Sequence, residues 1–103
     1  MKSLSLKPRH RWYLGSLVND QPSTVAEWQM EANIQKKLSY ADFQLLNGFG
    51  TMADEQRDDE SAIGIDFEEA EFSFMAAAFF RSKHAGQFKA IARECRDLIE
   101  AAK

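Results

Sequence analysis

The clearest pattern of hydrophobic and polar positions covers residues 86–103. Apolar residues recur there at intervals of three and four positions, which is the repeat of an α-helix with one buried face. They are Phe88, Ile91, Ala92, Cys95, Leu98, Ile99 and Ala102. Gly86 stands just before this run as a helix breaker. The spacing therefore predicts a final amphipathic helix with a single buried stripe.

A second helix is predicted immediately before it, over roughly residues 67–84. Asp66 and Glu69 have the three-residue spacing of a capping box at its start. The first turn carries acidic side chains and the last turn carries basic ones, including His84, as the helix dipole favours. The centre, FSFMAAAFF, is apolar on nearly all sides, so we expect it to be buried on more than one face.

These two helices together predict a helical hairpin at the end of the chain. We expect its core to bring together Phe74, Phe88, Ile91 and Leu98, which lie on the facing stripes. A rival pattern overlaps the start of the hairpin, because Ile63, Ile65 and Phe67 alternate with Gly64 and Asp66 as in a strand. A short strand over residues 62–66 therefore remains an open alternative.

The helix signals continue upstream. Thr24 and Glu27 form a further capping box, which starts a helix that runs to about Leu38. Its apolar face is expected to comprise Val25, Trp28, Ala32 and Gln35, widened by Met30, Ile34 and Leu38. Ser39 and Asp42 then indicate a shorter helix over residues 40–47 that ends at Gly48.

The first 20 residues carry mixed signals. Leu4 and Leu6 alternate with polar residues as in a strand, whereas Pro8 favours the start of a helix that contains Trp12, Tyr13, Leu17 and Val18. The predicted fold is therefore mainly α, a compact bundle of four to five short helices that ends in a helical hairpin. Its α+β alternative adds a strand pair from residues 3–7 and 62–66. At 103 residues the chain is expected to form one domain, 1–103.

Composition indicates a folded protein and bears on the cellular compartment in which it works. A hydrophobic fraction of 45% with eight Phe and two Trp is enough for a core. Cys95 is the single cysteine, so an internal disulfide and a thiolate zinc cluster are both excluded. The longest apolar run near the start, Trp12–Leu14, is far shorter than the ~7–15 residues of a signal peptide core. We therefore expect a cytoplasmic protein with no membrane association.

Charge is unevenly distributed. The net charge is only −3, but residues 54–71 hold nine carboxylates and one base, Arg57, and so carry −8. The rest of the chain is therefore +5, and the first eleven residues supply +4 of that. The sequence predicts a strongly dipolar molecule.

Chemical motifs are scarce. Neither a phosphate-binding glycine loop nor GxGxxG occurs. An EF-hand loop counted from Asp59 would place Gly64 correctly, but it would put Ile63 and Ala70 at ligand positions. His10 and His84 are too few for a metal site, and Cys95 falls in a buried stripe, where a thiol acts as a small hydrophobe. We expect no catalytic residue, no metal and no cofactor.

The leading hypothesis is a non-enzymatic protein-interaction module: a small acidic-faced regulator, inhibitor or immunity-type protein that binds a basic surface of another protein. Its candidate partner-binding residues are Asp54, Glu55, Asp58, Asp59, Glu60, Asp66 and Glu68. A simpler interpretation folds the basic termini against this acidic middle within one chain.

The alternative function is a nucleic-acid-binding regulator that uses the basic start and the last helix. Its candidate contacts are Lys7, Arg9, Arg11, Lys89, Arg93 and Arg96. A pI near 5.3 disfavours it, because non-specific affinity depends on phosphate neutralisation. The second alternative is a small enzyme of unknown chemistry.

Overall fold

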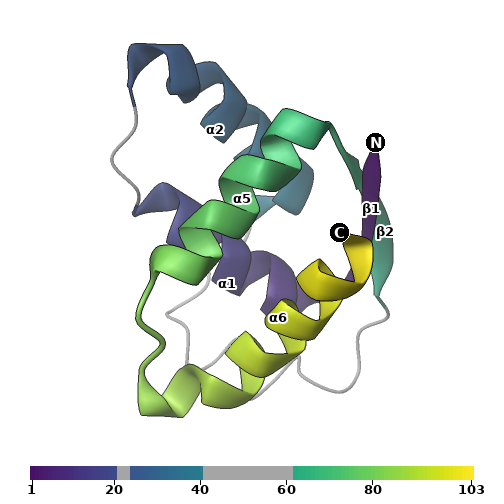
Figure 1. The fold of residues 1–103 in the computed structure, drawn as a ribbon, viewed down its shortest axis with the longest axis vertical. Coiled ribbons are helices and arrows are strands. Elements are labelled where there is room, and N and C mark those ends of the chain that lie inside the picture. The colour runs from purple at the N-terminus through teal and green to yellow at the C-terminus, as the bar shows by residue number, and fades with distance from the viewer. Residues whose placement is uncertain (21–23, 41–61) are drawn as a thin grey trace.

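The computed structural model describes residues 1–20, 24–40 and 62–103. Its elements, in chain order, are β1 (Lys2–Leu6), α1 (Pro8–Asn19), α2 (Val25–Leu38), β2 (Ile63–Phe67), α5 (Glu69–Arg81), a 3-10 turn (Gly86–Phe88) and α6 (Lys89–Ala102) (Figure 1). The described part is therefore mainly helical with a small two-stranded sheet. This confirms the predicted fold class, including the strand pair.

The two strands pair antiparallel along one edge of the molecule (Figure 1). Leu4 lies opposite Ile65, and Leu6 lies opposite Ile63. Leu4, Leu6, Ile65 and Phe67 are buried, while the residues that alternate with them are more exposed, as a sheet with one covered face requires. The observed strands differ from the predicted ranges by one residue each.

Helix α1 is the centre of the helical part. It packs against α2, α5 and α6 and also contacts β1. One continuous core joins the sheet to all four described helices. Its larger members are Leu4, Leu6, Tyr13, Leu14, Val18, Ile34, Leu38, Ile65, Phe67, Phe72, Met75, Phe79, Ile91, Cys95 and Ile99.

Three of the helices begin with the same local device. The backbone N–H of the N-cap residue donates to the side chain three positions later: Lys7 to His10 Nδ1 at 3.2 Å, Thr24 to Glu27 Oε1 at 3.0 Å, and Glu68 to Glu71 Oε1 at 2.9 Å. This is one half of a capping box, and it fixes where each helix starts. The predicted box at Thr24 is confirmed.

The predicted start of α5 is wrong by two residues. Phe67 belongs to β2, where it pairs with Lys2 and is fully buried, so the helix can begin only after it. The capping pair is therefore Glu68 with Glu71, in place of Asp66 with Glu69. The helix also ends at Arg81, so His84 lies beyond it and is not a residue of its last turn.

The predicted hairpin core is corrected too. Ile91 is buried, but Phe74, Phe88 and Leu98 are only partly buried at the edge of the core. The reason is that α1 packs against both α5 and α6. Helix α5 consequently buries a different set of side chains, with Phe72, Met75 and Phe79 as the largest.

The predicted apolar face of α2 is largely exposed. Val25 and Trp28 are 73% and 61% exposed, and Ala32 is exposed as well. Ile34 and Leu38, which were predicted to widen that face, are buried, and Met30 packs against the core as well. The start of α2 projects away from α1 and α5, so its first turn does not reach the core (Figure 1). The shorter helix predicted over 40–47 lies almost wholly outside the described residues.

Candidate functional site

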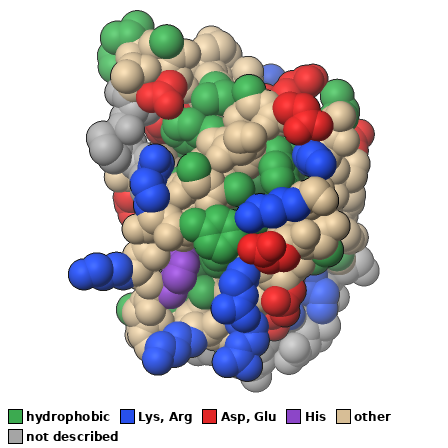
Figure 2. Space-filling view, viewed as in Figure 1, with side chains coloured by type: hydrophobic (Ala, Val, Ile, Leu, Met, Phe, Trp, Pro, Cys, Tyr) green, Lys and Arg blue, Asp and Glu red, His purple; other side chains and the backbone are tan. Residues whose placement is uncertain are grey.

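An open pocket lies between the end of α5 and the outer face of α6. Its volume is about 420 Å³. The lining combines aromatic, basic and small residues: Phe79, Phe80, Ser82, His84, Lys89, Ala92, Arg93 and Arg96. On this face of the molecule, basic side chains gather over α6 and the α5–α6 connection, with hydrophobic side chains beside them (Figure 2). The pocket is the best candidate for a ligand site in the described part of the chain.

The basic side of the pocket follows from helical spacing. Lys89, Arg93 and Arg96 are separated by four and three residues, so one face of α6 presents all three. All three residues are exposed. Arg96 Nε lies 3.9 Å from an Asp97 carboxylate oxygen, a pair in which both side chains are more than half exposed. Among the residues that the structure describes, no carboxylate forms an ion pair with Lys89 or Arg93.

The aromatic side comes from the last turns of α5. Phe79 is buried, and Phe80 is 46% exposed. Their rings meet edge to face, with centroids 5.1 Å apart and planes at 85°. This arrangement is favourable for aromatic pairs. Phe79 thus braces a ring that solvent can reach.

His84 also lines the pocket, and its ring is held in place by Phe79 and Tyr13. Its ring lies 4.6 Å from that of Phe79, and its Nδ1 is hydrogen-bonded to the Tyr13 hydroxyl. Burial raises the pKa of Tyr13 to about 12, so this hydroxyl keeps its proton. A link to α1 fixes the orientation of the ring.

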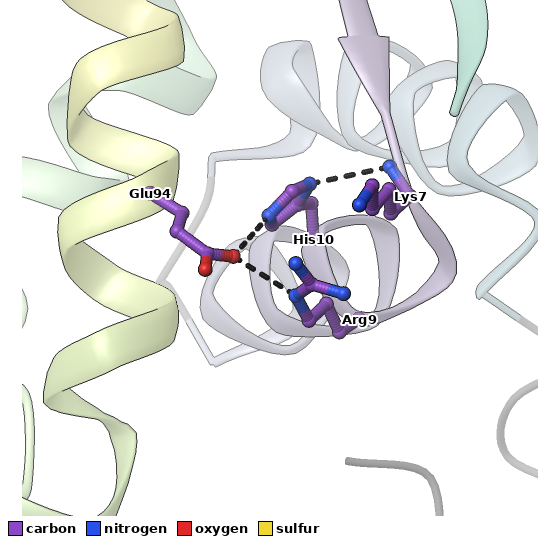
Figure 3. Close-up of polar contacts among 4 residues, drawn as sticks. All are labelled: Lys7, Arg9, His10 and Glu94. Carbon is purple, nitrogen blue, oxygen red and sulfur yellow. Dashed lines mark hydrogen bonds and ion pairs between the residues drawn. The ribbon is translucent and has the colours of Figure 1, made fainter. Parts of the chain in front are cut away.

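A second polar cluster joins α1 to α6 (Figure 3). His10 Nε2 lies 2.7 Å and Arg9 Nε 2.9 Å from the same Glu94 oxygen, Oε1. Since His10 Nδ1 accepts from the Lys7 N–H, Nε2 carries the proton and donates to Glu94. One Glu94 oxygen thus holds both Arg9 and His10, so we interpret this cluster as a structural clamp.

Burial has opposite effects on the two titrating groups of the clamp. It lowers the pKa of His10, and the hydrogen bond to Glu94 only partly offsets this. Burial alone would raise the pKa of Glu94, but hydrogen bonds from Arg9 and His10 outweigh it and hold that pKa below its ordinary value. The clamp is therefore built around a neutral imidazole and an ionised carboxylate.

The structure divides the predicted basic contacts into two groups. Lys89, Arg93 and Arg96 come together at the pocket. Arg9 is committed to Glu94, with 13% of its side chain exposed. Lys7 occupies the N-cap of α1, and Arg11 is half-buried on the same helix. Three of the six candidates thus form a surface, and the others do not join it.

The predicted acidic face can be followed only in part. Asp54, Glu55, Asp58, Asp59 and Glu60 lie outside the described residues. Asp66 is on β2, where it accepts a hydrogen bond from Ser3 Oγ, and Glu68 is the N-cap of α5. Glu71, from the same acidic run, is buried and pairs with Lys37 Nζ at 2.6 Å. These three described acids therefore have roles within the fold.

Cys95 lies in the buried stripe of α6, as the sequence analysis predicted. The Cys95 thiol is buried, and burial raises its pKa. Within residues 1–20, 24–40 and 62–103, no group of three or more His, Cys, Asp or Glu side chains could hold a metal ion. Over the same residues, no helix combines the length and the apolar character needed to cross a bilayer.

Sequence reasoning identified the cations of the pocket but missed its aromatic side and the clamp. The apolar centre of α5 was expected to be buried, which is correct for Phe79 but wrong for Phe80, since nothing local reveals which side of an apolar helix faces solvent. The His10 cap was readable, because His10 stands three residues after Lys7 with Pro8 between them. Comparison with family models, with curated proteins and with solved structures finds no match.

Proposed function

We propose that this chain is a non-enzymatic binding module that binds an anionic group in the pocket between α5 and α6. The observation that carries the proposal is the meeting of Lys89, Arg93 and Arg96 with an exposed aromatic ring around one hollow. Ligand sites combine concave shape and apolar walls with a few convergent polar groups, and this pocket has all three.

The charge arrangement is poorly explained by folding stability. Exposed ion pairs contribute only about 0–1 kcal/mol, and Lys89 and Arg93 lack such pairs in the described part of the chain. Lys89 is also the first residue of α6, where the helix dipole disfavours a cation by roughly 0.3–1 kcal/mol. Acidic residues are absent from the first turn of that helix. An anion bound there would compensate both the like charges and the dipole.

The same pocket gives little support for catalysis. Ser82 Oγ donates to the Ala78 carbonyl oxygen at 2.8 Å, and His84 Nδ1 is engaged by Tyr13. In the described residues no hydrogen bond joins Ser82 to His84, so the arrangement of a nucleophile with its base is not formed. Binding is the function that this geometry favours.

Heparin, a dense polyanion, tests the proposal. We expect the wild-type chain to be retained at low salt and Arg93→Gln to elute at a lower salt concentration, because one anion contact is removed. Lys36→Gln is the matched control, since Lys36 is an exposed cation on α2, which contributes nothing to the pocket. Equal elution of both variants with the wild type, or no retention at all, would contradict the proposal.

The acidic run is proposed to bind a different partner from the pocket. We retain the hypothesis that Asp54, Glu55, Asp58, Asp59 and Glu60 bind a basic protein, which would give the chain a second partner besides the anionic group. Asp66 and Glu68 are weaker members of that set, because Ser3 and the start of α5 already use them.

A further inference from the structure

We infer that the ligand of this pocket is an unpaired stretch of nucleic acid, with a base stacked on Phe80 and the neighbouring phosphates held by Lys89, Arg93 and Arg96. The inference rests on the proposed function and names its ligand. Three features lead to it: an aromatic face within reach, cations placed beside it, and a pocket of suitable size.

The Phe80 ring is both accessible and held in place. Phe79 supports it edge to face, and the terminal ammonium of Lys103 lies 4.6 Å from the ring centroid. That contact shows that one face of the ring can be reached, because the Lys103 side chain is itself about half exposed. An exposed cation–π contact contributes about two- to fivefold to an equilibrium. A stacked base contributes about fivefold or more to affinity, so it can displace the ammonium.

The cations are of the type that recognises phosphate. Two of the three are arginines, whose planar guanidinium binds phosphate oxygens in pairs. They share the pocket with Phe80, and its volume of about 420 Å³ falls within the range of ligand sites. An acidic peptide would use these cations but would leave the aromatic face without a role. Nucleic acid uses both.

The aromatic face also selects between paired and unpaired strands. In a duplex the base faces are covered by their neighbours, so they are not available to a protein ring. Unpaired bases are free to stack on aromatic side chains, and proteins that bind single strands combine such rings with basic grooves. We therefore expect a preference for single strands.

The overall charge sets the scale of the affinity. With a net charge of −3, the chain gains nothing from long-range attraction, and only local contacts favour the strand. Three cations can neutralise at most three phosphates. The logarithm of the binding constant should then fall with the logarithm of salt concentration at a slope of about −2 for a single strand.

Fluorescence anisotropy with labelled oligothymidine tests the inference, with the oligothymidine–oligodeoxyadenosine duplex as comparison. Arg93→Gln should reduce the slope to about −1.4. Phe80→Leu should weaken binding about fivefold or more while the slope stays the same, because it removes stacking and no charge. Lys36→Gln and Trp28→Leu are matched controls on α2, and both should bind like the wild type.

The remaining variants and competitors decide between explanations. Phe80→Tyr keeps an aromatic face and should bind within about twofold of the wild type, which separates stacking from general damage to the fold. Polyglutamate should compete poorly at equal charge. Equal competition by polyglutamate, equal affinity for the duplex, or unchanged binding by Phe80→Leu would each overturn the inference. If heparin binding still depended on Arg93, those results would leave the proposed function standing. If heparin binding failed as well, both would fall.

Discussion

Gly15 shows how a single residue can fix the distance between two helices. Gly15 lies on α1, opposite Gln35 of α2 and Tyr40, which follows α2. A Cβ at this position would lie 2.6 Å from Tyr40 Cδ1 and 3.0 Å from Gln35 Oε1. Gln35 Nε2 also donates to the Gly15 carbonyl oxygen at 2.7 Å. Because the contact atom belongs to a stiff aromatic ring, a methyl group here would force α1 and the ring apart.

Gly15→Ala should therefore destabilise the protein by about 1–3 kcal/mol, the usual cost of overpacking. In an open helix position the same change would stabilise by roughly 0.5–1 kcal/mol, so the sign is the test. Urea unfolding gives the free energies. Gly64→Ala is the control, because nothing lies within 4 Å of a Cβ there, and it should be neutral or stabilising. A stabilised Gly15→Ala variant would contradict the close approach.

For helix α2, the start was easier to predict than the buried face. A capping box is read from residues three apart, so the start of α2 at Thr24 was found correctly. The buried face of α2 depends on its contacts with α1 and β2. Because β2 is distant from α2 in the sequence, the local pattern of apolar residues does not reveal which face is buried. The pairing of His10 with Glu94 was unpredictable for the same reason, since 84 positions separate them. The cations of α6 were found because their spacing is local.

The clamp between α1 and α6 makes their contact sensitive to pH. The unfolded chain protonates His10 as the pH falls through about 6.5, whereas burial delays this in the folded chain. The folded form therefore loses stability below that pH. Glu94 also lowers the stability of the folded form in acid, but at lower pH than His10. Its pKa is depressed in the folded chain, so the stability it contributes is lost as the pH falls below about 4.5.

We expect the free energy of unfolding to decrease from pH 7 to pH 4, with the part between about 6.5 and 4.5 due largely to His10. His10→Gln keeps an acceptor for the Lys7 N–H but cannot titrate, so it should flatten that part of the curve. Denaturant titrations at a series of pH values provide the measurement. Glu100→Gln, on the exposed side of α6, should leave the same interval unchanged. A His10→Gln curve as steep as the wild type would show that His10 does not carry the effect.

For the molecule as a whole, the uneven distribution of charge along the sequence bears on both proposals. The acidic run and the basic pocket face of α6 belong to one small chain, so each modifies the field that a partner of the other meets. At physiological salt, exposed charges more than about 8 Å apart are largely screened, which limits this influence to low salt.

Replacing Asp58 and Asp59 by Asn and Glu60 by Gln tests both proposals together. We expect the triple variant to melt at an unchanged or slightly higher temperature, because the crowded carboxylates repel one another. Its binding to polylysine should weaken, and its affinity for oligothymidine should rise at low salt only. A triple variant that unfolds would instead show that these acids are counter-charges for the basic part of the chain.

The pairing of β1 with β2 has a consequence for the order in which the protein can fold during synthesis. Lys2 pairs with Phe67, so β1 has no partner until the chain has passed residue 67. The packing of helix α1 is completed later still, because α1 packs against α6. The last turn of α6 is made about 35 residues after the end of β2. Contacts between distant parts of a chain slow folding relative to simple helical bundles. The nascent chain therefore exposes Leu4, Leu6 and Leu14 until β2 and α6 have been made, which makes β1 and α1 segments that need protection from aggregation.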